Sequence, residues 1–152
     1  MKIRVFDLSA IPLFNEDVRL QRSPPAGDEF KDRIAAADAL LIAVPEYNCS
    51  MSGALKNAIE WASRPPDTSP LSDKPVVLMG AGGGLGTARA QDHFRQVAVF
   101  PNMYVLNRPE VLVPFAQKAF DDDGKPTEPR IPEKVHQLLI ALAEWTVRLR
   151  VK

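Results

Sequence analysis

The chain contains two short, continuously apolar runs, each of which ends in a loop that leads into a stretch of helical period. The first run, residues 40–44, is stopped by Pro45, and the second, residues 76–79, leads into a glycine-rich loop. A strand that is apolar at every position is typical of a parallel sheet with helices on both faces, because a half-exposed strand would alternate. We therefore predict an α/β fold with a mainly parallel, doubly wound sheet and residues 40–44 near its centre.

The segments between these runs show the apolar spacing of amphipathic helices. A helix that opens at Ser50 or Ser52 must end by residue 64, because Pro65 cannot continue it. The other helices expected are residues 28–37 with Asp28 as N-cap, residues 87–99, and a final helix that starts near Pro132. Further strands are expected over residues 3–6 and, as two pieces of one strand, over 105–106 and 111–113, while residues 114–130 are expected to be irregular.

Length and charge limit the class of protein. A chain of 152 residues predicts one domain over residues 1–152. Lysine plus arginine (19) balance aspartate plus glutamate (19), which removes the electrostatic case for binding nucleic acid or an anionic membrane. No apolar run approaches the ~20 residues of a membrane helix, and the start lacks a signal-peptide core, so we expect a cytoplasmic protein. With 1 cysteine and 2 histidines, we expect neither an internal disulfide nor a metal site.

Glycine is concentrated in the loop after the second apolar run. Positions 80, 82, 83, 84 and 86 hold five of the 8 glycines of the chain. The G-x-G-x-x-G spacing fails from Gly80 and from Gly82, and no Gly-Lys-Ser/Thr tripeptide exists, so neither common nucleotide motif is present. A sharp strand-to-helix turn would need only one or two glycines. We therefore favour close contact with a ligand over a simple turn.

The loop after the first run, residues 45–50, has two interpretations that the spacing leaves open. Tyr47 and Asn48 could border a flat ligand at the carboxyl edge of the sheet. Alternatively, Asn48 is a turn residue and Tyr47 a packing residue. Cys49 lacks a neighbouring base and is expected to be an inert small residue.

These loops carry a resemblance to a known family. Residues 45–48, Pro-Glu-Tyr-Asn, and the helix at 52–61 resemble the first flavin loop and helix of the NADPH-dependent FMN reductase family, flavodoxin-like proteins that include quinone and chromate reductases. Residues 83–91 resemble the family's second flavin loop, and Arg95-Gln96 with residues 107–110 resemble its downstream segment. The resemblance covers nearly the whole chain in the family's order.

The resemblance implies an FMN-dependent oxidoreductase. Hydride would pass from NADPH or NADH to FMN, and then to a small acceptor such as a quinone or metal oxyanion, without a catalytic acid–base pair from the protein. It also implies a homodimer or homotetramer, with Arg95 and Glu110 as cross-subunit contacts. The residues assigned to the cofactor are Pro45, Glu46, Tyr47 and Asn48 on one side, and Gly82, Gly83 and Gly84 on the other.

The chain departs from the family pattern at its start. Residues 3–6 match the family's second strand, so a first strand and its Gly-Ser-x-Arg phosphate loop, about 30 residues or more, are expected to be missing. Three alternatives are open: the natural protein carries the unit upstream of Met1, residues 3–6 shift to pair with residues 40–44, or another subunit covers the edge. In the last two, the FMN phosphate would have to use Ser50, Ser52, Thr87 or Arg89.

The departure also supports an alternative function. The chain could be a non-catalytic flavodoxin-like remnant that serves as a binding or assembly module, with weak or no FMN binding.

Overall fold

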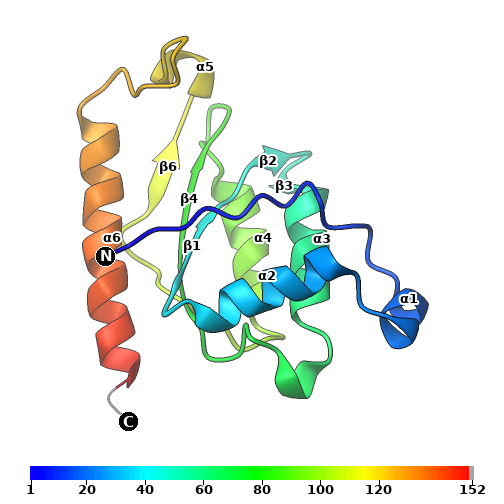
Figure 1. The fold of residues 1–152 in the computed structure, drawn as a ribbon. Helices are drawn as coiled ribbons and strands as arrows, with labels where there is room; N and C mark the ends of the chain where they lie inside the picture. The colour runs from blue at the N-terminus through cyan, green and yellow to red at the C-terminus, as the bar shows by residue number, and fades with distance from the viewer. Residues whose placement is uncertain (151–152) are drawn as a thin grey trace.

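The computed structural model describes residues 1–150, and strands alternate with helices along most of them (Figure 1). The strands are β1 (Leu40–Ala43), β2 (Glu46–Tyr47), β3 (Ser50–Met51), β4 (Pro75–Ala81), β5 (Tyr104–Val105) and β6 (Val111–Val113). The helices are α1 (Glu16–Gln21), α2 (Pro25–Ala36), α3 (Gly53–Ala62), α4 (Ala88–Ala98), α5 (Ala116–Ala119), α6 (Arg130–Arg150) and the 3₁₀ turn η1 (Pro66–Thr68).

Strand β4 is the centre of the parallel sheet. It pairs with β1 along one side, where Leu40 lies opposite Val76. On its other side, the beginning of β4 pairs with β5 and its end with β6, both in parallel. The parallel sheet and the last strand in two pieces are confirmed. The prediction that β1 lies near the centre is wrong, because β4 is the only strand paired with it in the described part of the chain.

Helices cover both faces of this sheet, with α6 on one face and α2, α3 and α4 on the other (Figure 1). Val76 and Leu78 of β4 are buried in the same cluster as Phe94 of α4, whereas Val77 is buried on the opposite face with Leu138 of α6. Successive side chains of a strand point to opposite faces, so β4 must be apolar at every position. Burying each such side chain contributes about 1.5–3 kcal/mol. The doubly wound α/β architecture is confirmed.

Residues 3–6 form no strand, and that prediction is wrong. Val5 is 95% exposed, because this segment lies outside the sheet. A strand needs the hydrogen bonds of a neighbouring strand, and no strand of the described residues pairs with this segment. The alternative in which residues 3–6 pair directly with β1 is contradicted for the same reason.

The chain is instead fixed to the fold further on, at residues 11–14, which lie on α3. Trp61 is fully buried, and its indole N–H donates to the carbonyl oxygen of Pro12 at 2.8 Å. The side-chain amide of Asn57 donates to the same carbonyl at 2.9 Å and accepts from the Phe14 N–H at 2.7 Å. The rings of Phe14 and Trp61 meet edge to face, 5.0 Å between centroids. This segment is therefore held by both polar and aromatic contacts.

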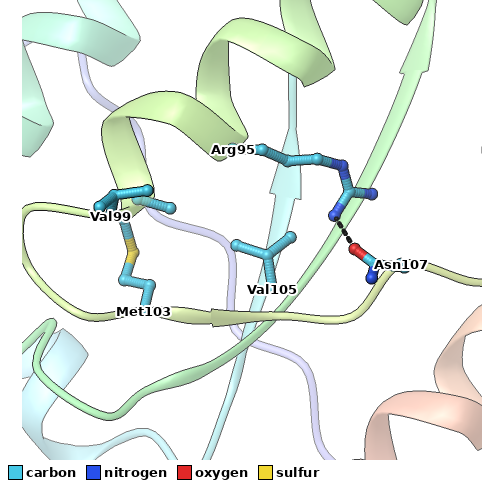
Figure 2. A pocket seen from close by; sticks show the side chains of 6 residues that line it. Arg95, Val99, Met103, Val105 and Asn107 are labelled. Carbon is cyan, nitrogen blue, oxygen red and sulfur yellow. Dashed lines mark hydrogen bonds between the residues drawn. The ribbon is translucent and has the colours of Figure 1, made fainter.

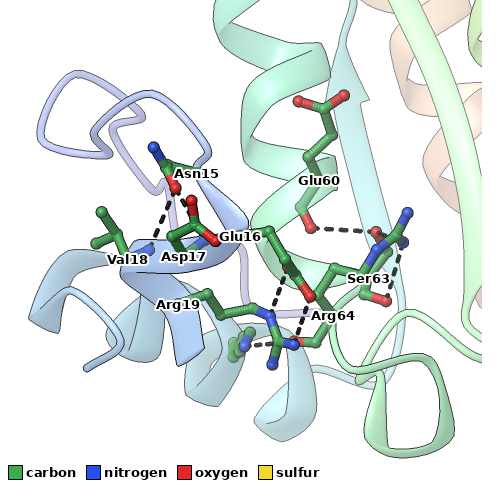
Figure 3. A network of polar contacts seen from close by, with 9 residues as sticks. Asn15, Glu16, Asp17, Val18, Arg19, Glu60, Ser63 and Arg64 are labelled. Atoms are coloured by element: carbon green, nitrogen blue, oxygen red, sulfur yellow. Dashed lines mark hydrogen bonds and ion pairs between the residues drawn. The ribbon is translucent and has the colours of Figure 1, made fainter. Parts of the chain in front are cut away.

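The short helix α1 follows this segment, although the sequence analysis did not predict it. Its N-cap is Asn15, whose side-chain oxygen accepts from the N–H groups of Asp17 and Val18 (Figure 3). An ion pair between Arg19 and Glu16, 2.7 Å apart, joins positions on one helix face. These two contacts supply the local stability that so short a helix needs.

The helix boundaries follow their capping groups. Ser52 is the N-cap of α3, as predicted, and its hydroxyl oxygen accepts from the Leu55 N–H at 3.2 Å. Asp28 was predicted as the N-cap of α2, but it lies in the first turn, because the helix already starts at Pro25. The region 114–130, expected to be irregular, contains α5, and α6 starts slightly before Pro132. None of the helices described is long and apolar enough to cross a membrane.

Candidate functional site

The two loops singled out in the sequence lie at the carboxyl ends of neighbouring strands, β1 and β4. The first loop forms a hairpin in which β2 pairs with β3, so that Tyr47 lies opposite Ser50. Asn48 (φ 51°) and Cys49 (φ 61°) have the left-handed conformations of a type I′ turn. Asn48 is therefore a turn residue, as one interpretation predicted. Tyr47 is 67% exposed, so the interpretation of it as a packing residue is wrong.

Glu46 connects this hairpin to helix α4. The side chain of Thr87, the N-cap of α4, forms no capping hydrogen bond. The carboxylate of Glu46 instead accepts from the backbone N–H of Ala90, with 3.2 Å between Oε2 and N. A carboxylate at this position both satisfies a free N–H group and interacts favourably with the helix dipole. Glu46 is thus a capping group that comes from a different loop.

Two further polar contacts hold the hairpin tip against the same helix. The hydroxyl of Ser50 lies 2.9 Å from Nδ1 of His93. The guanidinium of Arg89 donates to the sulfur of Cys49 at 3.0 Å. Together with Glu46, these contacts fix the first loop relative to α4, and α4 begins directly after the glycine loop.

Three of the five loop glycines are required by the loop itself. A Cβ at Gly80 would lie 2.0 Å from the hydroxyl oxygen of Thr87, and one at Gly82 would lie 2.2 Å from the carbonyl oxygen of Gly86. Gly86 has φ +64°, and its Cβ would lie 3.0 Å from the nitrogen of Val113. The prediction that a turn would use only one or two glycines is therefore wrong, because the turn is unusually tight.

The internal packing of the loop does not require the other two glycines. No heavy atom of the described chain outside its two neighbours lies within 4 Å of the position of a Cβ at Gly83, and at Gly84 only the ring of Phe115 does, at 3.8 Å. Neither residue has a positive φ. Moreover, the N–H groups of Gly84 and Leu85 have no acceptor within residues 1–150. This part of the loop therefore combines an exposed backbone with free N–H donors.

A buried amide positions β6 beside this loop. Gln91 donates from Nε2 to the hydroxyl oxygen of Thr87 at 3.0 Å and to the carbonyl oxygen of Val111 at 3.2 Å. The sequence analysis missed Gln91, since a glutamine on a helix normally lies on its exposed face. Phe115, two residues after β6, was also missed, because its proximity to Gly84 depends on contacts between distant parts of the chain.

The groups considered for the FMN phosphate already have partners. Ser52 caps α3, and the hydroxyl of fully buried Thr87 accepts from Gln91. Ser50 and Arg89 hold the hairpin through His93 and Cys49. The Ser52 hydroxyl accepts one hydrogen bond and keeps its own O–H donor, and the Arg89 guanidinium has further N–H donors, so these two groups could bind a phosphate without losing their present contacts.

A cavity lies beside β5, at the end of the sheet opposite the two loops. It measures about 210 Å³ and is lined by Arg95, Ala98, Val99, Met103, Val105 and Asn107 (Figure 2). Because β5 pairs with the beginning of β4, this cavity is not part of the carboxyl edge. Arg95 donates to the side-chain oxygen of Asn107 at 3.1 Å, so within this chain it has a partner. No group of metal-binding side chains was found among residues 1–150.

Comparison with known proteins gives consistent matches. The sequence model for NADPH-dependent FMN reductase matches residues 1–118. The chain is 52% identical over 151 residues to the NAD(P)H-dependent FMN reductase PA1204 of Pseudomonas aeruginosa, covering 99% of the chain and 81% of the relative. It is 39% identical over 155 residues to the NADPH:quinone oxidoreductase of Arabidopsis thaliana, covering 100% of the chain and 78% of the relative.

The fold comparison agrees. The structure of FerB, a flavoenzyme NAD(P)H:(acceptor) oxidoreductase from Paracoccus denitrificans, superposes with a TM-score of 0.82 at 29% sequence identity. The match covers 93% of this chain and 78% of FerB. This chain therefore spans about four-fifths of the length of the proteins it matches.

Proposed function

The chain belongs to the NADPH-dependent FMN reductase family, and from this membership we propose that its two loops at the carboxyl edge hold FMN for NAD(P)H-dependent reduction of a quinone. When bound, FMN supplies the redox chemistry, by accepting hydride from NAD(P)H and passing electrons to an acceptor. The contribution of the protein is to bind and orient the reactants. Such chemistry does not require an acid–base pair from the protein.

One observation carries the assignment of the site. Gly83 and Gly84 are glycines that the internal packing of the loop does not require, and beside them the N–H groups of Gly84 and Leu85 are free. A flat ring with polar edge atoms fits such a surface, since it can approach the bare backbone and accept hydrogen bonds from it. The residues present therefore fit the ring of FMN.

We propose the following positions for the ring. Gly82, Gly83 and Gly84 lie along one side, and Pro45, Glu46, Tyr47 and Asn48 along the other. In this arrangement the exposed Tyr47 supplies an aromatic edge, while Glu46 acts through its bond to α4. For the phosphate, the half-buried Ser50 and the exposed Arg89 are candidate groups, and both already bond within the protein.

The experiment is a titration of the purified chain with FMN, followed by an assay of NADPH and NADH oxidation with 1,4-naphthoquinone. We expect quenching of FMN fluorescence and turnover that depends on added FMN. Gly83→Val should weaken FMN binding without lowering the thermal stability of the FMN-free protein, and Gly124→Asn, in a distant turn with φ +74°, is the matched control. Absence of both flavin binding and turnover in the unmodified chain would contradict the proposal and support a non-catalytic binding module.

Two further properties are proposed. A homodimer or homotetramer is supported by exposed apolar side chains at the end of α4 (Val99 and Phe100) and on α6 (Ile140 and Val147). Light scattering that reports a monomer would contradict it. A cytoplasmic location is supported by Cys49, an exposed free thiol suited to a reducing compartment. Cell fractionation tests the location.

A further inference from the structure

Phe115 is held against the glycine loop by backbone hydrogen bonds. Its N–H donates to the carbonyl oxygen of Gly83 at 3.1 Å, and the N–H of Ala116 donates to that of Gly82 at 2.8 Å. The carbonyl oxygen of Val113 accepts from the Gly82 N–H at 3.0 Å. Phe115 is therefore fixed beside the loop that we propose as one wall of the site.

The conformation of Phe115 is unusual for an aromatic residue. Its backbone is left-handed, with φ 52° and ψ 55°, which costs free energy for a bulky side chain. The side chain nevertheless remains 58% exposed, so burial in the core does not offset this cost. Its ring lies 3.8 Å from the position of a Cβ at Gly84, and Leu85, the next residue of the loop, is exposed as well.

The strained backbone thus places a flat apolar ring at the rim of the glycine loop, where the ring is too exposed to stabilise the fold much. A planar aromatic molecule could stack on that surface, whereas a compact, strongly hydrated ion could not. We propose that Phe115 is a specificity-determining residue that contacts the electron acceptor and favours planar quinones over small hydrophilic acceptors. This inference rests on the proposed function of the two loops.

The test compares Phe115→Gly with the unmodified protein, both loaded with FMN. Glycine adopts the left-handed conformation without strain, and this gain offsets the greater freedom of glycine in the unfolded chain, so the variant should fold with a similar thermal stability. We expect kcat/KM for 1,4-naphthoquinone to fall about fivefold to tenfold, mainly through KM, as loss of one stacking contact implies. We expect kcat/KM for ferricyanide and the Kd for FMN to be unchanged. Val5→Gly, which removes an exposed apolar side chain outside the two loops, is the control.

Binding of oxidised naphthoquinone to the FMN-loaded proteins, measured by calorimetry without NAD(P)H, should weaken by the same factor in Phe115→Gly only. Equal quinone affinity and kinetics in both proteins would overturn the assignment of Phe115. A parallel loss with quinone and ferricyanide, or a weaker Kd for FMN, would also overturn it, because the ring would then serve the cofactor or the fold. Turnover of 1,4-naphthoquinone by the unmodified, FMN-loaded protein tests the proposed function separately, and its absence would remove both claims.

Discussion

Removing the carboxylate of Glu46 should loosen the first loop from α4. Glu46→Ala leaves the Ala90 N–H without its acceptor at the start of a helix whose own N-cap side chain does not bond. Loss of a capping group together with its charge costs about 1–2 kcal/mol for a half-exposed residue. At about 2–4 °C per kcal/mol for a domain of this size, Tm should fall by about 2–8 °C. Glu46→Gln keeps an oxygen acceptor and loses only the charge, so about 0.5 kcal/mol is expected.

The matched control is Glu60→Ala on α3. Glu60 pairs with Lys56 on the helix surface, where such a pair contributes about 0.3–0.5 kcal/mol. Thermal unfolding and FMN titration should be measured for all three variants. We expect Glu46→Ala to weaken FMN binding as well as stability, Glu46→Gln to restore most of both, and Glu60→Ala to leave FMN binding unchanged. If the two alanine variants had the same Tm, the capping role of Glu46 would be refuted.

Three other predictions concern the stability of the fold. Gly82→Ala should lower the free energy of unfolding by more than ~2 kcal/mol, because its Cβ would lie 2.2 Å from a backbone oxygen. Gly83→Ala should change the free energy of unfolding by less than about 0.5 kcal/mol in the same denaturant titrations. Equal effects of the two substitutions would contradict the division of the loop glycines into two groups. Trp61→Phe should cost about 1–2 kcal/mol and increase protease cleavage near residues 11–14, since it removes the indole bond to Pro12; unchanged cleavage would show that this bond does not hold the segment. Burial lowers the pKa of Lys74 in the folded protein below its value in the unfolded chain. Between these two pKa values the unfolded chain binds more protons, so the destabilisation caused by burying the charged amine disappears as pH rises. At alkaline pH, the Tm of the unmodified protein should therefore rise relative to that of Lys74→Met. A difference in Tm that stays constant with pH would contradict this.

Elements with local signals could be predicted from the sequence. Ser52 followed by an apolar period and ended by Pro65 specifies α3 without reference to the rest of the fold. The apolar run in β4 is similarly informative, because burial on both faces leaves no polar position. The two loops could also be placed at the carboxyl edge, since each follows a buried strand.

Features that depend on contacts between distant residues could not be predicted. Residues 3–6 have the composition of a strand, but a strand exists only where another strand offers hydrogen bonds, and that partner is not a property of the segment. The same applies to Phe115, whose backbone conformation is set by Gly82 and Gly83. Asp28 was misplaced for a different reason, namely that Pro25 can start a helix earlier than an aspartate can cap it.

Helix α4 joins the two halves of the candidate site into one mechanical unit. The N–H of Ala90 in its first turn binds Glu46 from the hairpin. The next residue, the buried Gln91, binds Thr87 from the glycine loop and Val111 from β6. A displacement of either loop must therefore move α4 or break a hydrogen bond to it. Because the glycines that the fold requires lie on the inner side of this unit and Gly83 and Gly84 on its open side, the loop can be rigid and still leave its backbone accessible. Rigidity with an accessible backbone is what orientation of a flat cofactor requires.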